Sequence, residues 1–165
     1  VAANGDLLLV DNSNRRVRRI GADGIIRTIA GTGRTEYAGD DGPAMQASFL
    51  SPWGVAEGPD GSLYVSDYRG HVVRRISPAG TISHYAGLRR DFGDGGPAVF
   101  ARLVSPTKIA FDAAGNGYIS EQSSGRIRRV DPSGRISTLI DWRFPTAHPV
   151  SLLPIGDGSV LVAIG

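Results

Sequence analysis

The chain has 165 residues, of which 41% are hydrophobic and 21% are charged, and this composition is typical of a globular protein rather than a disordered one. Eighteen basic and 16 acidic residues give a net charge of only +2, with the two signs interspersed, which argues against a nucleic-acid-binding surface. The absence of cysteine excludes disulfides, thiolate zinc sites and cysteine nucleophiles, and no apolar run approaches the length of a membrane-spanning helix. Because the chain begins inside a repeat at Val1, we expect any targeting segment to lie upstream.

One pattern occurs three times along the chain, in residues 8–20, 64–76 and 118–130. The copies superpose without gaps at intervals of 56 and 54 residues, and each contains an acidic residue followed by a turn and a β-branched residue, two arginines and an aliphatic residue. A recurrence at this spacing indicates a repeat architecture, in which each unit covers its apolar faces with its neighbours.

Each unit contains four short strand patterns separated by turns rich in Gly, Pro and Asp. In the second unit the predicted strands are Trp53–Ala56, Ser62–Ser66, Val72–Ile76 and Thr81–Tyr85. No stretch shows the 3.6-residue periodicity of a helix. Four strands in a basic unit of some 43 residues predict an all-β fold, a β-propeller of four-stranded antiparallel blades.

Two glycine-rich inserts interrupt this period. Gly39–Ala44 matches Gly93–Ala98, whereas the fourth unit has only the short stretch Arg143–His148 at the corresponding place. The inserts, which we place at residues 32–48 and 88–102, are therefore optional connectors between blades. The predicted blades span 1–31, 49–87, 103–141 and 149–165, which gives 13 strands, or about 3.5 blades. We interpret the whole chain as one propeller segment.

The repeat resembles the NHL repeat. The resemblance depends on the pattern Asp-X-X-X-X-(Arg/His)-(Val/Ile)-Arg-Arg-Ile, followed by Gly-X-Ile-X-Thr-X-Ala-Gly and Gly-Asp-Gly-Gly-Pro-Ala, and it is greatest to the bacterial and teneurin-like branch. The third unit departs from it, with Leu139-Ile140-Asp141 in place of Ala-Gly.

The resemblance implies a ring of six blades, of which this chain would form half. We therefore expect the remaining blades either in a longer parent chain or in a second copy. The family also favours a secreted, extracellular or periplasmic bacterial protein.

In a propeller, the loops between the second and third strands and the inserts lie on one face, where longer loops build a binding surface. On this face we expect the residues that contact a protein or glycan partner: Asp11, Asn12, Asn14, Asp67, Tyr68, Arg69, His71, Glu121 and Gln122.

Two recurring features have a structural and a functional interpretation. The acidic residues Asp11, Asp67 and Glu121 either begin turns and accept backbone N–H groups, which we favour, or form a ring of carboxylates that holds a divalent cation. The paired arginines lie within strands, so alternation places the two members on opposite faces of a blade, with their guanidinium groups paired to carboxylates or carbonyls. We expect the glycine-rich insert to be a compact connector, because it lacks the residues of a phosphate or calcium loop.

Three functions remain open from the sequence. A non-catalytic binding or scaffold propeller without a cofactor is favoured, because no catalytic constellation is present. A metal-dependent lactonase-like hydrolase is the alternative, for which Asn12, Asn14 and Glu121 are the candidate ligands. An RNA-binding domain is a third interpretation, less favoured because the arginines lie in strands rather than loops.

Overall fold

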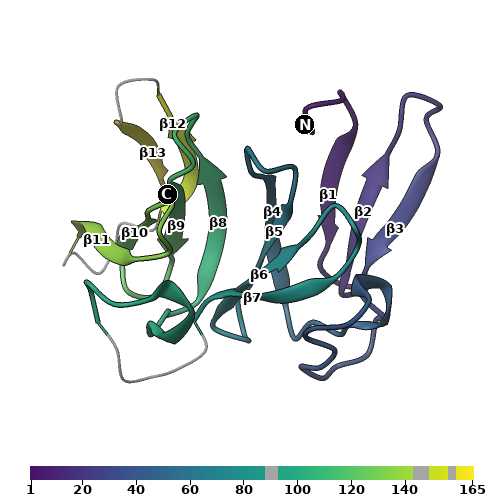
Figure 1. Ribbon diagram of the computed structural model, residues 1–165, viewed down its shortest axis with the longest axis horizontal. Helices are drawn as coiled ribbons and strands as arrows, with labels where there is room; N and C mark the ends of the chain where they lie inside the picture. Colours follow the sequence, from purple (N-terminus) through teal and green to yellow (C-terminus); the bar gives the residue numbers. More distant parts are fainter. Residues whose placement is uncertain (88–92, 143–148, 156–158) are drawn as a thin grey trace.

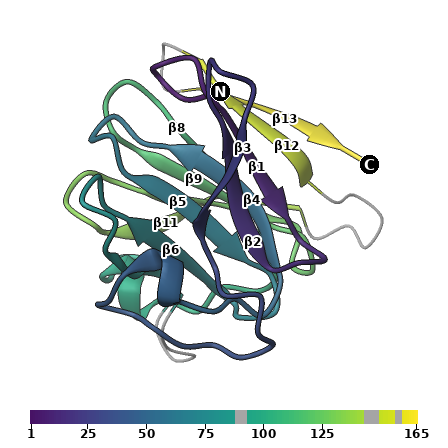
Figure 2. The same cartoon turned by 90° about the vertical axis from the view of Figure 1, so that its right-hand side faces the viewer.

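The computed structural model describes residues 1–87, 93–142, 149–155 and 159–165, which form thirteen strands in four antiparallel sheets (Figure 1). The sheets stand side by side and each consists of strands consecutive in sequence, as in the blades of a propeller (Figures 1 and 2). The first sheet contains β1 (Leu7–Asp11), β2 (Arg16–Ile20) and β3 (Ile26–Ala30). The second contains β4 (Pro52–Glu57), β5 (Leu63–Asp67), β6 (Val72–Ile76) and β7 (Ile82–Ala86). The third contains β8 (Pro106–Phe111), β9 (Gly117–Glu121), β10 (Arg126–Val130) and β11 (Ile136–Asp141), and the fourth β12 (Pro149–Pro154) and β13 (Val160–Ile164).

This arrangement confirms the predicted all-β partial ring, with 3, 4, 4 and 2 strands in successive sheets. The four strands of the second blade begin and end within one residue of their predicted limits. The described residues contain only two short 3-10 turns, η1 (Ala44–Gln46) and η2 (Ala98–Phe100), and none of their helices is long and apolar enough to cross a membrane.

The hydrophobic core lies between blades. One cluster joins the first blade to the second and includes Val17, Phe49 and Val65. The other joins the second blade to the third and includes Tyr64, Ile119 and Ile136. Each blade therefore depends on its neighbour to bury its apolar face, as expected of a repeat protein.

Inner strands β4 and β8 approach each other so closely that one position of β4 must be glycine. A Cβ atom at Gly54 would lie 2.4 Å from the carbonyl oxygen of Thr107, so only glycine fits there. Both strands carry a β-bulge, at Trp53 and at Thr107. The amide after each bulge donates to a serine of the second strand, Gly54 to Ser66 Oγ at 2.9 Å and Lys108 to Ser120 Oγ at 3.0 Å.

Each glycine-rich insert lies across the outer strand of the blade that follows it. In the first insert, the amide of Asp41 donates to the carbonyl of Ile82 at 2.7 Å, and the amide of Ile82 donates to Gly42 at 2.9 Å. In the second, Gly95 and Gly96 make the same two bonds with Ile136, at 2.7 and 3.0 Å.

The inserts are also bonded to the blade that precedes them. The amides of Gly31 and Gly87 donate to the carbonyls of Ala44 and Ala98, at 3.0 and 3.1 Å. Both alanines are buried. The inserts are therefore compact connectors, as expected, and they fasten one blade to the next.

The third blade ends differently from the first two because it has no glycine at the end of its outer strand. Where the first two blades have Gly31 and Gly87 in a left-handed conformation, the third has Asp141, and strand β11 continues through it. The carboxylate of Asp141 pairs with Arg126 at 3.4 Å. The expected short connector 143–148 lies outside the described residues.

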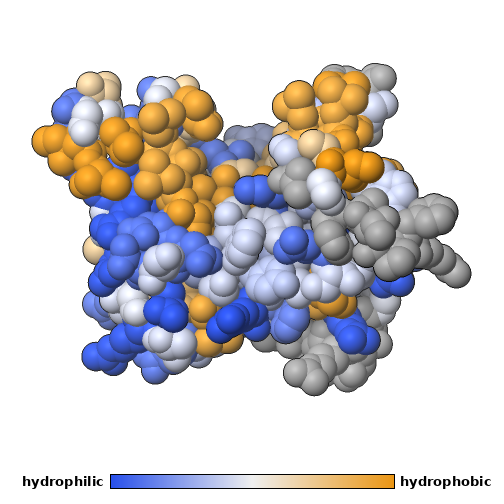
Figure 3. All heavy atoms as spheres, turned by 180° about the vertical axis from the view of Figure 1, so that it is seen from behind, coloured by the Kyte–Doolittle hydropathy of each residue, from blue (hydrophilic) through white to orange (hydrophobic). Residues whose placement is uncertain are grey.

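The first and last sheets present hydrophobic side chains to solvent (Figure 3). These residues are Leu7, Ile25 and Ile26 on the first sheet and Leu153, Leu161 and Ile164 on the last, each roughly half exposed. Corresponding surfaces of the two central blades are buried against their neighbours. The outer sheets thus have the exposure expected of the two ends of a partial ring.

Candidate binding face

The turns after β1, β5 and β9 lie on the same side of the molecule as the two inserts, the lower side in Figure 1, which we call the insert face. Hydrogen bonds join these turns to the start of the neighbouring inner strand. The amide of Tyr68 donates to Ser51 at 2.8 Å, and that of Gln122 donates to Ser105 at 3.1 Å. The side chain of Asn12 donates to the carbonyl of Pro52 at 2.6 Å. The structure therefore brings together the loops expected to form a binding surface.

Asp67 and Glu121 are buried and bind backbone groups. Asp67 accepts hydrogen bonds from the amides of Leu50 at 2.8 Å and Ser51 at 2.7 Å. Glu121 accepts one from the amide of Val104 at 2.8 Å, and burial raises its pKa. Asp67 also accepts a hydrogen bond from the amide of Gly70 in its own turn at 3.1 Å, as the turn interpretation expects, whereas the other amides belong to the segments before the inner strands.

Asp11 occupies the same repeat position but has different partners. Its carboxylate accepts hydrogen bonds from Asn14 Nδ2 at 2.9 Å and forms an ion pair with Arg18 at 2.9 Å. Hydrogen bonds from these two side chains lower the pKa of Asp11.

The fifth residue of each turn has a positive φ angle. Arg15 and His71 have φ values of 52° and 56°, and the equivalent Gly125 has 65°. Only glycine adopts this conformation without strain. His71 also accepts a hydrogen bond at Nδ1 from the amide of Ser105 at 3.1 Å, which ties the second blade to the third.

An aromatic pair stands on the insert face beside these turns. The rings of Trp53 and Tyr68 lie 5.5 Å apart, and Trp53 is 45% exposed. Hydrogen bonding to Ser123 and Ser105 lowers the pKa of Tyr68. Arg69 is exposed, and no carboxylate of the described residues pairs with it.

Trp53 was missed as a site residue by the sequence analysis, which placed it only within a strand. The bulge in β4 leaves this residue out of the ladder, between the paired residues Pro52 and Gly54. A signal was present in the alignment of repeats, because the third blade has the small Thr107 at the same position, buried and bonded to Ser120 Oγ at 3.0 Å. A large residue that occurs at a repeat position in one blade alone is a better sign of a binding site than a residue that recurs in every blade.

The paired arginines have internal partners. Arg74 is fully buried, with an ion pair to Asp40 at 2.8 Å and hydrogen bonds to the carbonyls of Ser48 and Ala38. Arg128 pairs with Asp94 at 2.7 Å in the same way. The second members, Arg75 and Arg129, bond instead to Asp60 and Asn116. The alternation expected from the strand is therefore present in the second and third blades, and each of these four guanidinium groups has a protein acceptor.

The candidate metal ligands do not converge. Asn12 bonds to Pro52, Asn14 bonds to Asp11, and Glu121 is buried beneath the amide of Val104. Among the described residues, no group of three or more His, Asp or Glu side chains is arranged to hold a metal ion.

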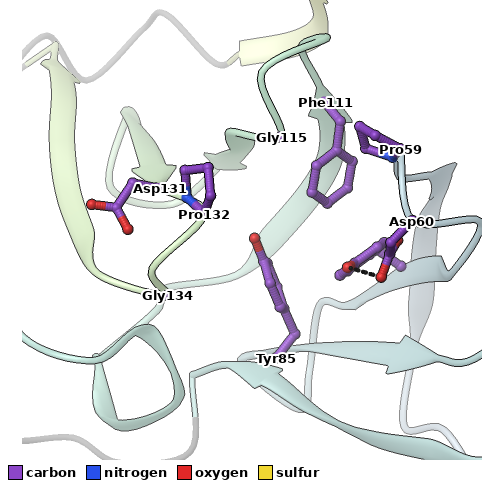
Figure 4. Close-up of a pocket in the computed structure, with 9 residues that line it drawn as sticks. Pro59, Asp60, Tyr85, Phe111, Gly115, Asp131, Pro132 and Gly134 are labelled. Atoms are coloured by element: carbon purple, nitrogen blue, oxygen red, sulfur yellow. Dashed lines mark hydrogen bonds between the residues drawn. The ribbon is translucent and has the colours of Figure 1, made fainter.

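A pocket of about 270 Å³ lies between the second and third blades, among the turns opposite the insert face (Figure 4). Tyr85, Phe111, Pro59 and Pro132 line it. The adjacent Tyr64 packs 4.4 Å from Phe111 and 4.7 Å from Tyr85, measured between ring centroids, and its hydroxyl donates to Asp60. Burial raises the pKa of Tyr85. Because the rings pack on one another and the volume is small for a ligand site, we interpret this cluster as a contact between blades.

Comparison with known proteins agrees with this geometry. The family described as "Teneurin NHL domain" matches residues 23–92. Teneurin-1 of Caenorhabditis elegans is 29% identical over 90% of the chain, and Teneurin-3 of Mus musculus is 28% identical over 70%. The chain spans only 5% and 7% of the length of these two relatives. Because they are animal proteins, they give no support to the expected bacterial branch.

Solved structures with the same fold are about twice as long. Virginiamycin B lyase from Staphylococcus aureus superposes with a TM-score of 0.69 and 19% identity, over 98% of this chain and 46% of its own. A gluconolactonase from Xanthomonas campestris superposes with a TM-score of 0.66 and 17% identity, over 91% of this chain and 47% of its own. At these identities the likeness shows the fold alone. Together with the repeats and the radial sheets, these comparisons show a segment of a β-propeller whose repeats are similar to those of the teneurin NHL domain.

Proposed function

We propose that the chain is a binding module whose insert face contacts a protein partner through Trp53, Tyr68 and Arg69. The observation that carries the proposal is the exposed Trp53, packed on Tyr68, together with the neighbouring Arg69, which is exposed and has no ion-pair partner among the described residues. Trp, Tyr and Arg are the residues most enriched among those that dominate protein interfaces. Tyr68 packs on Trp53 and its backbone amide is bonded to Ser51, so binding would cost little conformational entropy there.

The hydrolase alternative has less support. Its candidate ligands each have internal hydrogen-bond partners, and Glu121 is buried. The lyase and gluconolactonase that share the fold are too distant in sequence to assign chemistry to this chain. RNA binding has less support still, because the first arginine of the pairs in blades two and three is buried in an ion pair.

The test is binding of fluorescent tetramers of the chain to intact cells of its source organism. We expect saturable binding that falls by about tenfold or more in the double variant Trp53→Ala, Tyr68→Ala, since a central interface aromatic typically contributes 2 kcal/mol or more. Met45→Ala is the matched control, because Met45 is exposed on the first insert but lies outside the aromatic pair.

Pretreatment of the cells separates the partner classes. Proteinase treatment should abolish binding, whereas glycosidase treatment should leave it intact. Loss on glycosidase treatment alone would instead indicate a glycan partner. Equal binding by the double variant and the parent chain would contradict the proposal.

A further inference from the structure

The outer surface of the first blade lacks the cover that the equivalent surfaces have. Ile26 occupies the position of Ile82 and Ile136 in the repeat. Ile82 and Ile136 are 0% and 1% exposed, whereas Ile26 is 56% exposed. The residue type is the same in all three blades, so the difference comes from the insert that crosses β7 and β11 and is not present over β3.

The backbone of the first blade is set for the same contact. Ile20 faces Ile26 in the ladder as Ile76 faces Ile82. In the second blade, the amide and carbonyl of Ile82 point out of the sheet and bond to Gly42 and Asp41 of the insert. The shared register directs the amide and carbonyl of Ile26 outward in the same way.

The side chains that bind an insert are also present in the first blade. In the second blade, Asp67 binds the amides of Leu50 and Ser51, which directly follow the insert, and Arg74 binds Asp40 within it. Their counterparts Asp11 and Arg18 pair with each other at 2.9 Å. In the first blade, the two side chains that would each bind an insert are therefore paired with one another.

We propose that this surface, formed by Asp11, Arg18 and Ile26, is the docking site for the Gly-Asp-X-Gly-Pro-Ala insert of a further NHL repeat. Such an insert presents a carboxylate to Arg18, backbone groups to Ile26 and amides to Asp11, as the two inserts of this chain do in their own blades. A second copy of this chain is a poorer occupant, because its inserts are already seated on its own β7 and β11.

The repeat register allows a direct test. Val1 corresponds to Glu57, so a second copy of residues 37–56 joined to Val1 supplies an insert and an inner strand in the correct order. We expect the extended chain to unfold at a higher denaturant concentration than the original.

A double-mutant cycle then isolates the proposed contact. In the extended chain, Arg18→Gln alone and Asp40→Asn in the added copy alone should each lower the folding equilibrium constant by about tenfold, and the two together by little more. Arg19→Gln is the matched control, because Arg19 faces Asp6, and its effect should add to that of Asp40→Asn. The added-copy variant changes no residue of the original chain, so the stability lost by Asp40→Asn in the extended chain can be measured even if Arg18→Gln fails to fold; no loss from that variant would also contradict the proposal.

Three results would overturn the proposal: an extended chain no more stable than the original, additive effects of Arg18→Gln and Asp40→Asn, or the same coupling for Arg19. A dimer of the unextended chain in which the Ile26 amide is protected from hydrogen exchange would also overturn it, because a second copy would then occupy the surface.

Discussion

At the scale of single residues, one repeat position has different partners in different blades. Asp67 and Glu121 are buried and bind the amides that follow an insert. Asp11 binds Arg18 instead. All three residues begin the same kind of turn. The difference is that an insert lies on the second and third blades, whereas, among the described residues, none lies on the first.

Glu121 should make stability depend on pH. Because burial raises its pKa above the ordinary value of 4.5, the folded state binds more protons than the unfolded state between 4.5 and the raised pKa. Its contribution to the free energy of unfolding is therefore present below pH 4.5 and is lost as the pH rises through the folded pKa. Denaturant unfolding of the parent chain and of Glu121→Gln, measured from pH 4 to 8, should show the parent losing stability relative to the variant as pH increases.

The comparison between the two proteins removes the effect of other carboxylates. Asp94 and Asp131 have lowered pKa values, so their contributions are lost as the pH falls below about 4, and both proteins share this loss. A difference between parent and variant that does not change with pH would show that Glu121 does not titrate as its burial implies.

Sequence reasoning reached some of these residues and not others. The position of Asp67 before a turn predicts its hydrogen bond from the amide of Gly70, because Asp commonly binds the amides of a turn that it opens. It does not predict the bonds from Leu50 and Ser51, which belong to the segment before β4. The bulge at Trp53 is not marked by any residue pattern, and only the comparison with the small, buried Thr107 at the same position of the third blade draws attention to this residue. The pairing of Asp11 with Arg18 could not be predicted from the sequence of the first blade, because it depends on whether an insert from another repeat lies on that blade.

At the scale of elements, the insert joins neighbouring blades by hydrogen bonds to both of them. It bonds to the end of one blade through Gly31 and to the outer strand of the next through Ile82. Arg74 reaches it from inside the second blade and makes three contacts with it, to Asp40, Ser48 and Ala38. The sequence shows that the insert recurs, but the blade on which it lies is visible only in three dimensions.

Removing one arginine of a pair should have a very different effect from removing the other. Arg74→Gln leaves Asp40 and two carbonyls without their buried partner and should cost about 3 kcal/mol of unfolding free energy. The adjacent Arg75 forms an exposed pair with Asp60, so Arg75→Gln should cost about 0–1 kcal/mol. Urea unfolding of the two variants measures this difference directly. Similar losses from both would mean that the buried pair does not fasten the insert.

At the scale of the whole molecule, the repeat determines most of the fold. Three copies of one pattern are enough to predict thirteen strands and their grouping into blades, because each blade uses only neighbouring strands in sequence. The aromatic contact among Tyr64, Tyr85 and Phe111 was not predictable, because its members come from two blades and only Tyr64 has an aromatic counterpart in the repeat, Tyr118. The exposed hydrophobic residues at both ends follow from the same architecture, since an outer sheet has a neighbour on one side only.

Residue-resolved amide hydrogen exchange tests most directly whether the chain is a stack of blades with two open ends. The account predicts a gradient, with the slowest exchange in β5 and β6 of the second blade, where most side chains are buried. Exchange in β12 and β13 should be faster by about 100-fold or more, because local opening of an end sheet breaks few contacts. Uniform protection across all four sheets would contradict the account, because it would mean that the end sheets are covered as completely as the central ones.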